Sequence, residues 1–122
     1  MQNRLPKRNE VAKELTWRLE DIYDDESKWE AELKEAGEIA DKMAGYAGKI
    51  SADGETLLEY LKLDEQLDLL MDRIHGYAHM REDQDTADAK YQALKQRAAS
   101  AYVMASEKTA FMRPEILSLS DA

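Results

Sequence analysis

Apolar residues recur at intervals of three or four along a first segment of the chain. They are Trp29, Leu33, Ala36, Ala40, Met43 and Ala47. This spacing places them on one face of an α-helix. Ser27 followed by Glu30 predicts a capping box at the start of this helix, and Gly45 and Gly48 predict its end.

A second apolar pattern follows Ser51 and Asp53, either of which can cap a helix. It consists of a leucine cluster and a continuing helical stripe: Leu57, Leu58, Leu61, then Leu63, Leu67, Leu70, Ile74 and Tyr77. The pattern ends near Arg81. The sequence leaves open whether residues 54–82 form one helix or two that meet near Lys62, because no proline and no glycine marks a break before Gly76.

A third pattern follows the polar segment REDQDT, for which Asp85 or Thr86 is the predicted helix cap. Its apolar members are Ala87, Tyr91, Leu94, Ala98, Ala101, Ala105 and Met112. We predict that Pro114 ends this helix, since the residue before a proline is pushed out of helical geometry.

These patterns predict three antiparallel helices of about 20 residues, each about 30 Å long. The predicted fold is all-α, an antiparallel up-down helical bundle of three long helices plus a short N-terminal helix. Residues 1–15 are expected to form an N-terminal arm. Thr16 is the predicted cap of the short helix, and the large apolar residues after it are expected to anchor the arm: Trp17, Leu19, Ile22 and Tyr23.

We expect residues 16–122 to form a single helical domain. Glu115, Ile116 and Leu117 suggest the start of a new element that the chain does not continue after SLSDA. The domain is therefore predicted to be truncated at its C-terminal end.

Composition narrows the possible functions. The chain has 122 residues, 35% of them charged, with a formal net charge of −9. Such a chain repels phosphate backbones, so we expect no nucleic-acid partner. The lack of cysteine excludes disulfides, thiolate metal sites and cysteine nucleophiles in this chain. With no signal-peptide pattern and no apolar run near the ~20 residues that span a bilayer, we expect a cytoplasmic protein without membrane contact.

The clearest candidate for chemistry is the stretch HGYAH, in which His75 and His79 have the spacing of the zinc motif H-E-x-x-H. With Asp68 and Asp72 they form a line of potential metal ligands. However, Gly76 stands where the motif has the glutamate that activates water. At about 100° per residue, both histidines also point away from the leucine stripe. We therefore predict a solvated helix face, and no catalytic, cofactor-binding or metal-binding residues in this chain.

Two stretches resemble a known protein family. LPKRNEV, then ELTWRLEDIY, then a helix beginning near SKWEAEL resemble the opening of oligoendopeptidase F and its relatives among the thimet-type zinc metallopeptidases. GYAHMREDQDTADAKYQAL resembles a later segment of the same family. The resemblance implies an N-terminal helical domain of a hydrolase that degrades short peptides.

The resemblance also implies where the chemistry lies. In this family the zinc is held by the two histidines of H-E-x-x-H and a glutamate further on, hundreds of residues downstream of this region. It therefore assigns no zinc ligand to His75 or His79. It implies a non-catalytic lobe that restricts access to the channel, with the missing catalytic domain and the oligopeptide substrates of the parent enzyme as partners.

Two other interpretations stay open from the sequence. The chain can be a free-standing helical interaction module, for example a dimer, or a small metal-binding bundle that uses His75 and His79. A lobe separated from its enzyme should expose an apolar patch that also permits self-association. We predict that this patch involves four residues outside the main stripes: Leu69, Met80, Val103 and Phe111.

Overall fold

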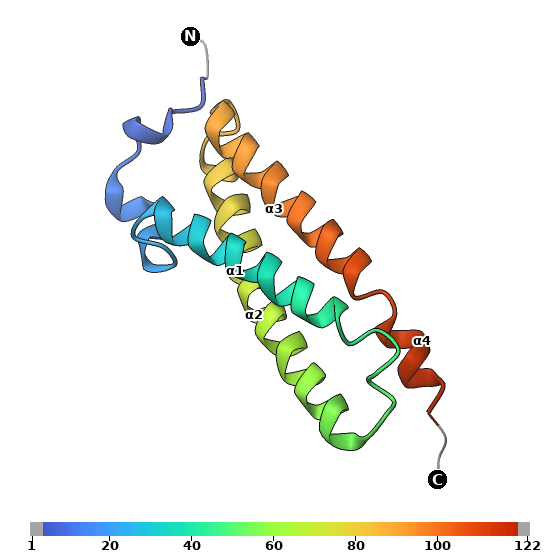
Figure 1. Ribbon diagram of the computed structural model, residues 1–122. Helices are drawn as coiled ribbons and strands as arrows, with labels where there is room; N and C mark the ends of the chain where they lie inside the picture. Colours follow the sequence, from blue (N-terminus) through green and yellow to red (C-terminus); the bar gives the residue numbers. More distant parts are fainter. Residues whose placement is uncertain (1–3, 120–122) are drawn as a thin grey trace.

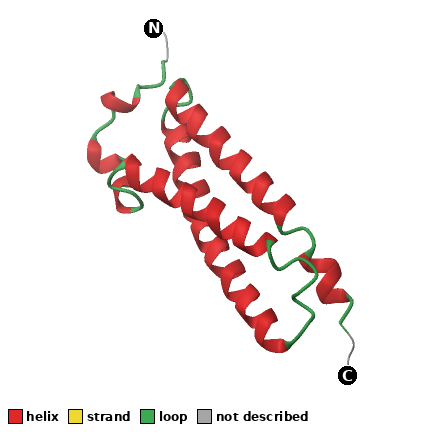
Figure 2. Ribbon diagram, viewed as in Figure 1, coloured by secondary structure: helices red, strands yellow, loops and turns green. Residues whose placement is uncertain are grey.

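Three long helices lie side by side and make up most of the molecule (Figure 1). The computed structural model describes residues 4–119, and within this range it contains helices and loops but no strand (Figure 2). The long helices are α1 (Glu26–Ala44), α2 (Gly54–Gln84) and α3 (Ala89–Lys108), and the short α4 (Met112–Leu117) follows. The predicted all-α bundle of three long helices is confirmed. Residues 1–3 of the predicted arm and residues 120–122 of the predicted domain lie outside the described range.

The start of α1 differs from the prediction. Asp25 is the N-cap, and its carboxylate accepts a hydrogen bond of 2.8 Å from the backbone N–H of Ser27. The prediction that Ser27 caps the helix is therefore wrong, because an aspartate two positions earlier already satisfies this donor and adds favourable charge at the helix N-terminus. The predicted end at Gly45 is confirmed, and Gly48 turns the chain with a φ of 77°.

Residues 54–84 form one continuous helix, α2, of 31 residues, which is longer than the predicted 20. Asp53 caps it by accepting a hydrogen bond of 2.7 Å from the backbone N–H of Thr56. The leucine cluster at its start is only partly correct, since Leu58 and Leu61 are exposed whereas Tyr60 between them is fully buried. The stripe from Leu67 to Tyr77 is buried as predicted.

Both predicted ends of the third helix are wrong. Asp88 caps α3, while Asp85 ends α2 and its side chain accepts a hydrogen bond from the backbone N–H of Ala87. The helix stops at Lys108, and Pro114 lies in the first turn of α4. Proline fits there because backbone N–H groups of a first turn have no partner within the helix.

The segment before α1 is wound into three 3-10 turns: η1 (Arg8–Glu10), η2 (Lys13–Leu15) and η3 (Leu19–Asp21). Thr16 is not an N-cap as predicted. It ends η2, and its hydroxyl donates to the carbonyl of Lys13. Leu19 and Tyr23 anchor the segment as expected, but Trp17 is exposed, so its predicted anchoring role is wrong. The boundary between arm and domain at residue 15 stays a prediction.

The core lies where the three long helices meet. Its largest fully buried side chains are Trp29, Tyr60, Tyr77, Met43, Ile50 and Ile74. The Nε1 of Trp29 on α1 donates a hydrogen bond of 3.1 Å to the carbonyl oxygen of Ile74 on α2. Alanines on α1 and α3 let these two helices approach closely around a small cavity of about 90 Å³.

Three ion pairs join α1 to α3 and show that these two helices run in the same direction. Successive acidic residues of α1 meet successive basic residues of α3: Glu26 with Lys90, Glu30 with Arg97, and Asp41 with Lys108. The connecting helix α2 is therefore antiparallel to both. Because these pairs are exposed, they fix register more than they add stability.

Gly37 and Gly48 provide a matched test of the backbone. Gly37 is exposed inside α1, and a β-carbon there would meet no atom within 4 Å. We expect Gly37→Ala to raise the free energy of unfolding by about 1 kcal/mol, because alanine loses less backbone freedom in a helix. Gly48→Ala should lower it by roughly 1–2 kcal/mol, because its φ is left-handed. Urea unfolding followed by circular dichroism measures both changes, and effects of the same sign would contradict this backbone.

Candidate functional site

His75 lies where α2 packs against α3. Its ring is edge-on to the ring of Tyr102 on α3, with 5.5 Å between centroids, and is stacked on the ring of His79 at 6.1 Å. The Nε2 atom of His75 is buried and has no hydrogen-bond partner within residues 4–119. The prediction that His75 points into water is therefore wrong, because α3 covers a flank of α2 that the leucine stripe does not mark.

The surroundings of His75 favour its neutral form. Burial lowers the pKa of His75 below the ordinary value of 6.5, and the neighbouring His79 lowers it further. The backbone of Ala98 and the carboxylate of Asp72 act in the opposite direction but are weaker influences. The imidazole is therefore uncharged at neutral pH.

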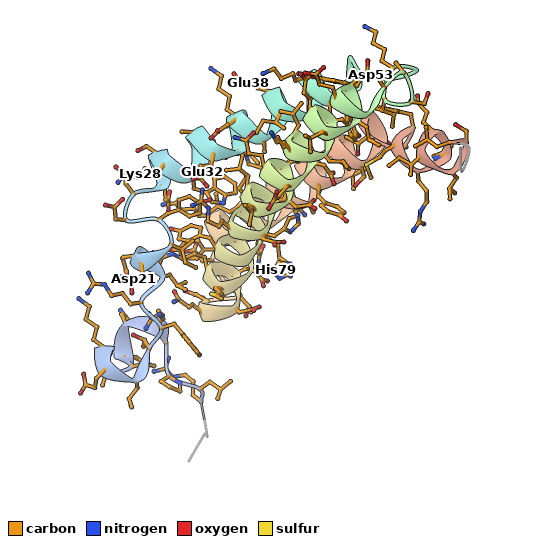
Figure 3. All side chains as sticks on the ribbon, turned by 90° about the horizontal axis from the view of Figure 1, so that it is seen from below. Asp21, Lys28, Glu32, Glu38, Asp53 and His79 are labelled. Atoms are coloured by element: carbon orange, nitrogen blue, oxygen red, sulfur yellow. The ribbon has the colours of Figure 1, made fainter. Side chains whose placement is uncertain are left out.

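The other members of the predicted ligand line face outward. His79, Asp68 and Asp72 are exposed on α2, and Figure 3 labels His79 on the later half of this helix. Across the described residues, no three histidine or carboxylate side chains are arranged to hold a metal ion. Since His75 is turned towards α3 and Gly76 supplies no carboxylate, the residues present do not fit a catalytic zinc centre. That the whole chain lacks a metal site stays a prediction.

A second polar cluster lies between α2, α4 and the loop after α1. One carboxylate oxygen of Glu115 accepts a hydrogen bond from the backbone N–H of Gly48, and the other is buried without a partner in the described part of the chain. Burial raises the pKa of Tyr60 to about 12, with smaller contributions from Asp64 and Glu115. A phenol that resists ionisation is no general base at neutral pH. The hydrogen bond from Gly48 to Glu115 connects α4 to the loop after α1.

A third cluster joins η3 and the start of α1 to α2. The hydroxyl of Tyr23 donates to Glu32, which also pairs with Arg73, and burial raises the pKa of Tyr23. The ring of Tyr23 meets that of Tyr77 edge-on at 5.1 Å between centroids. Figure 3 labels Glu32 on α1. Glu32 thus binds both Tyr23 and Arg73 and connects the segment before α1 to α1 and α2.

Of the four residues predicted to form an exposed apolar patch, three are exposed. Leu69, Met80 and Val103 are 62%, 44% and 54% exposed. Phe111 is wrong, because its ring packs against that of Tyr60 at 5.7 Å between centroids. The exposed three do not share a pocket: Leu69 lines one between α1 and α2, and Met80 lines another beside the N-terminal segment.

The most exposed aromatic side chain of the described residues was missed as a surface candidate. Trp17 is 82% exposed, and Leu15 beside it is 77% exposed. The sequence analysis treated Trp17 as an anchor because large apolar residues usually lie inside. The available signal was its position in a segment without helical periodicity.

Known proteins are similar to this chain over nearly all of its length. It is 39% identical over 119 residues to oligopeptidase PepF of Bacillus subtilis, a match that covers 98% of this chain but 18% of the relative. It is 36% identical over 111 residues to the chromosomal oligoendopeptidase F of Lactococcus lactis subsp. cremoris, covering 90% of this chain and 18% of the relative. Over the matched residues, the chain is homologous to proteins of the oligoendopeptidase F family.

The resemblance predicted from LPKRNEV and ELTWRLEDIY is thus confirmed. The chain is also 30% identical over 115 residues to group B oligopeptidase PepB of Streptococcus agalactiae, and the match covers 19% of that relative. The chain therefore spans less than a fifth of the length of these oligopeptidases. No family model and no solved structure matches the chain. Among the described residues, no helix is both long and apolar enough to cross a bilayer.

Burial of His75 predicts how stability depends on pH. The unfolded chain, in which this histidine has its ordinary pKa, binds a proton more readily than the folded chain. The free energy of unfolding should therefore decrease as the pH falls from about 7.5 to about 5.5. His75→Gln should remove this contribution, whereas His79→Gln should retain most of it because burial is the main cause. Urea unfolding at both pH values measures the change in the free energy of unfolding. If this change were the same in His75→Gln as in the wild type, the neutral state of the partly buried His75 ring would be contradicted.

Proposed function

We propose that the chain is the non-catalytic N-terminal lobe of a zinc oligopeptidase and restricts access to its catalytic channel. The observation that carries this proposal is the uneven coverage of the match. Nearly all of this chain aligns with relatives of which it spans only 18–19%. A segment that is similar from end to end to one part of a longer enzyme is best understood as a domain of such an enzyme.

The helical architecture supports a role as a wall. Backbone hydrogen bonds of a helix are satisfied within the helix, so a bundle offers no unpaired strand edge to an extended peptide. The hydroxyl of Tyr23 and one carboxylate oxygen of Glu115 are hydrogen-bonded to other parts of the bundle. A wall of this kind can exclude folded proteins by size while leaving peptide binding to the catalytic domain.

The remaining parts of the proposal come from the family. The relatives are named oligopeptidases, so we propose short peptides as substrates of the complete enzyme. Zinc and the groups that bind it would belong to the catalytic domain, which is also the lobe's main partner. The cytoplasmic location stays a prediction.

A chimera tests the proposal. This chain would replace the matched 119 residues of Bacillus subtilis oligopeptidase PepF. We expect the chimera to hydrolyse a quenched fluorescent oligopeptide and to leave intact casein uncut, because the lobe closes the channel to large substrates. The 122-residue chain alone should not hydrolyse the peptide, with or without added zinc.

Two controls sharpen this test. Trp29→Ala in the chimera should unfold the lobe and reduce the preference for oligopeptides over casein, because the buried indole lies at the centre of the bundle. Leu58→Ser, at an exposed position of α2, should leave it unchanged. Hydrolysis by the isolated chain, or a folded chimera without peptidase activity, would overturn the proposal.

A further inference from the structure

The N-terminal segment carries an unusual group of exposed apolar side chains. Trp17 and Leu15 are 82% and 77% exposed, and neither belongs to the core. The other tryptophan, Trp29, is fully buried. An exposed indole contributes little to the stability of the bundle, so the folding of this domain does not explain its presence.

These side chains border an open pocket of about 350 Å³ between the N-terminal segment and the end of α2. Leu15, Trp17, Leu19 and Met80 supply its apolar lining, and Arg8 and Asp83 lie among its polar residues. In Figure 1 the N-terminal segment, blue, lies to one side of the three long helices. Leu15 and Trp17 of this segment are exposed and are therefore accessible to another surface.

Charge separates this segment from the rest of the chain. The first 19 residues contain five basic and two acidic side chains, whereas the remaining residues contain 12 basic and 24 acidic ones. Arg8, Lys13 and Arg18 lie with Trp17 around a neighbouring pocket. Tryptophan and arginine are the residues most enriched at the energetic centres of protein interfaces.

We propose that residues 4–19 form the docking surface for the part of the oligopeptidase that this chain does not span, with Trp17 as the anchor. The inference rests on the proposed function. The occupant should offer an apolar pocket for the indole, with acidic groups around it to meet the basic side chains. Leu69 on α2 and Val103 on α3 are also exposed, but they lie outside this basic segment.

The length of the relatives favours this occupant over a second copy. The chain spans 18–19% of them. In such a polypeptide, about four-fifths of the residues would therefore be held close to the docking surface formed by residues 4–19. Covalent connection gives an effective concentration of roughly millimolar, which no free copy reaches at ordinary concentrations. A second copy could also offer acidic bundle residues to this segment, and self-association of the isolated chain tests that alternative.

The two tryptophans make a direct experiment possible. Labelling this chain with 5-fluorotryptophan gives two fluorine resonances, one from Trp17 and one from Trp29. The unmatched part of Bacillus subtilis oligopeptidase PepF is then added without label. We expect the Trp17 resonance to shift or broaden, while the Trp29 resonance, from a buried ring, stays in place.

Matched variants identify the anchor. Trp17→Ser should weaken the affinity at least tenfold, as expected for the loss of a central interface tryptophan. Leu58→Ser, which removes an exposed apolar side chain from the other half of α2, should leave the affinity unchanged. Thermal unfolding of the isolated chain should be the same for both variants and the wild type, because both positions are exposed.

The outcomes separate this inference from the proposed function. Binding that Trp17→Ser does not weaken would overturn the inference and leave the proposed function standing. If the unmatched part does not fold alone, limited proteolysis of the chimera replaces the titration. Trp17→Ser should then make the junction between the lobes easier to cleave. Unchanged cleavage of this variant in an active chimera would overturn the inference. If the isolated chain self-associates and Trp17→Ser abolishes this, the docking surface binds a second copy, and the inference is overturned. A folded but inactive chimera would instead overturn the proposed function.

Discussion

The indole of Trp29 on α1 is fully buried, donates a hydrogen bond to Ile74 of α2, and lies 5.3 Å from the guanidinium carbon of Arg97 on α3. One side chain thus contacts all three long helices. Arg97 in turn pairs with Glu30, the residue that follows Trp29 in α1, so the polar contact at the surface reinforces the apolar contact below it. Replacing a buried tryptophan of this kind by alanine lowers the free energy of unfolding by about 3–5 kcal/mol. This is a large part of the roughly 5–15 kcal/mol that stabilises a domain.

Polar groups of the bundle also hold its elements together. Tyr23 and Glu32 connect the N-terminal segment to α1 and α2, while Glu115 and Gly48 connect α4 to the loop between the first two helices. Each of these groups holds a peripheral element against the bundle. This arrangement suits the structural role proposed for the lobe, and it leaves Leu15 and Trp17 of the N-terminal segment exposed.

The two histidines illustrate a limit of helical periodicity. A helical wheel places His75 and His79 on the same outer side of α2, but a third helix covers one of them and leaves the other in water. The wheel records which direction a side chain takes and not what lies in that direction. The same reason explains why Phe111 was expected at the surface although Tyr60 covers it.

The sequence by itself determined the three helices, because their spacing of apolar residues depends only on the geometry of a single helix. It also determined the family, through motifs that are contiguous in the chain. The exact caps, Asp25 and Asp88 among several adjacent acidic residues, were beyond it, since neighbouring side chains compete for the same few N–H groups. Only the tertiary structure decided that His75 is covered and Trp17 is not, because burial depends on the position of other elements and not on the chemistry of the residue alone.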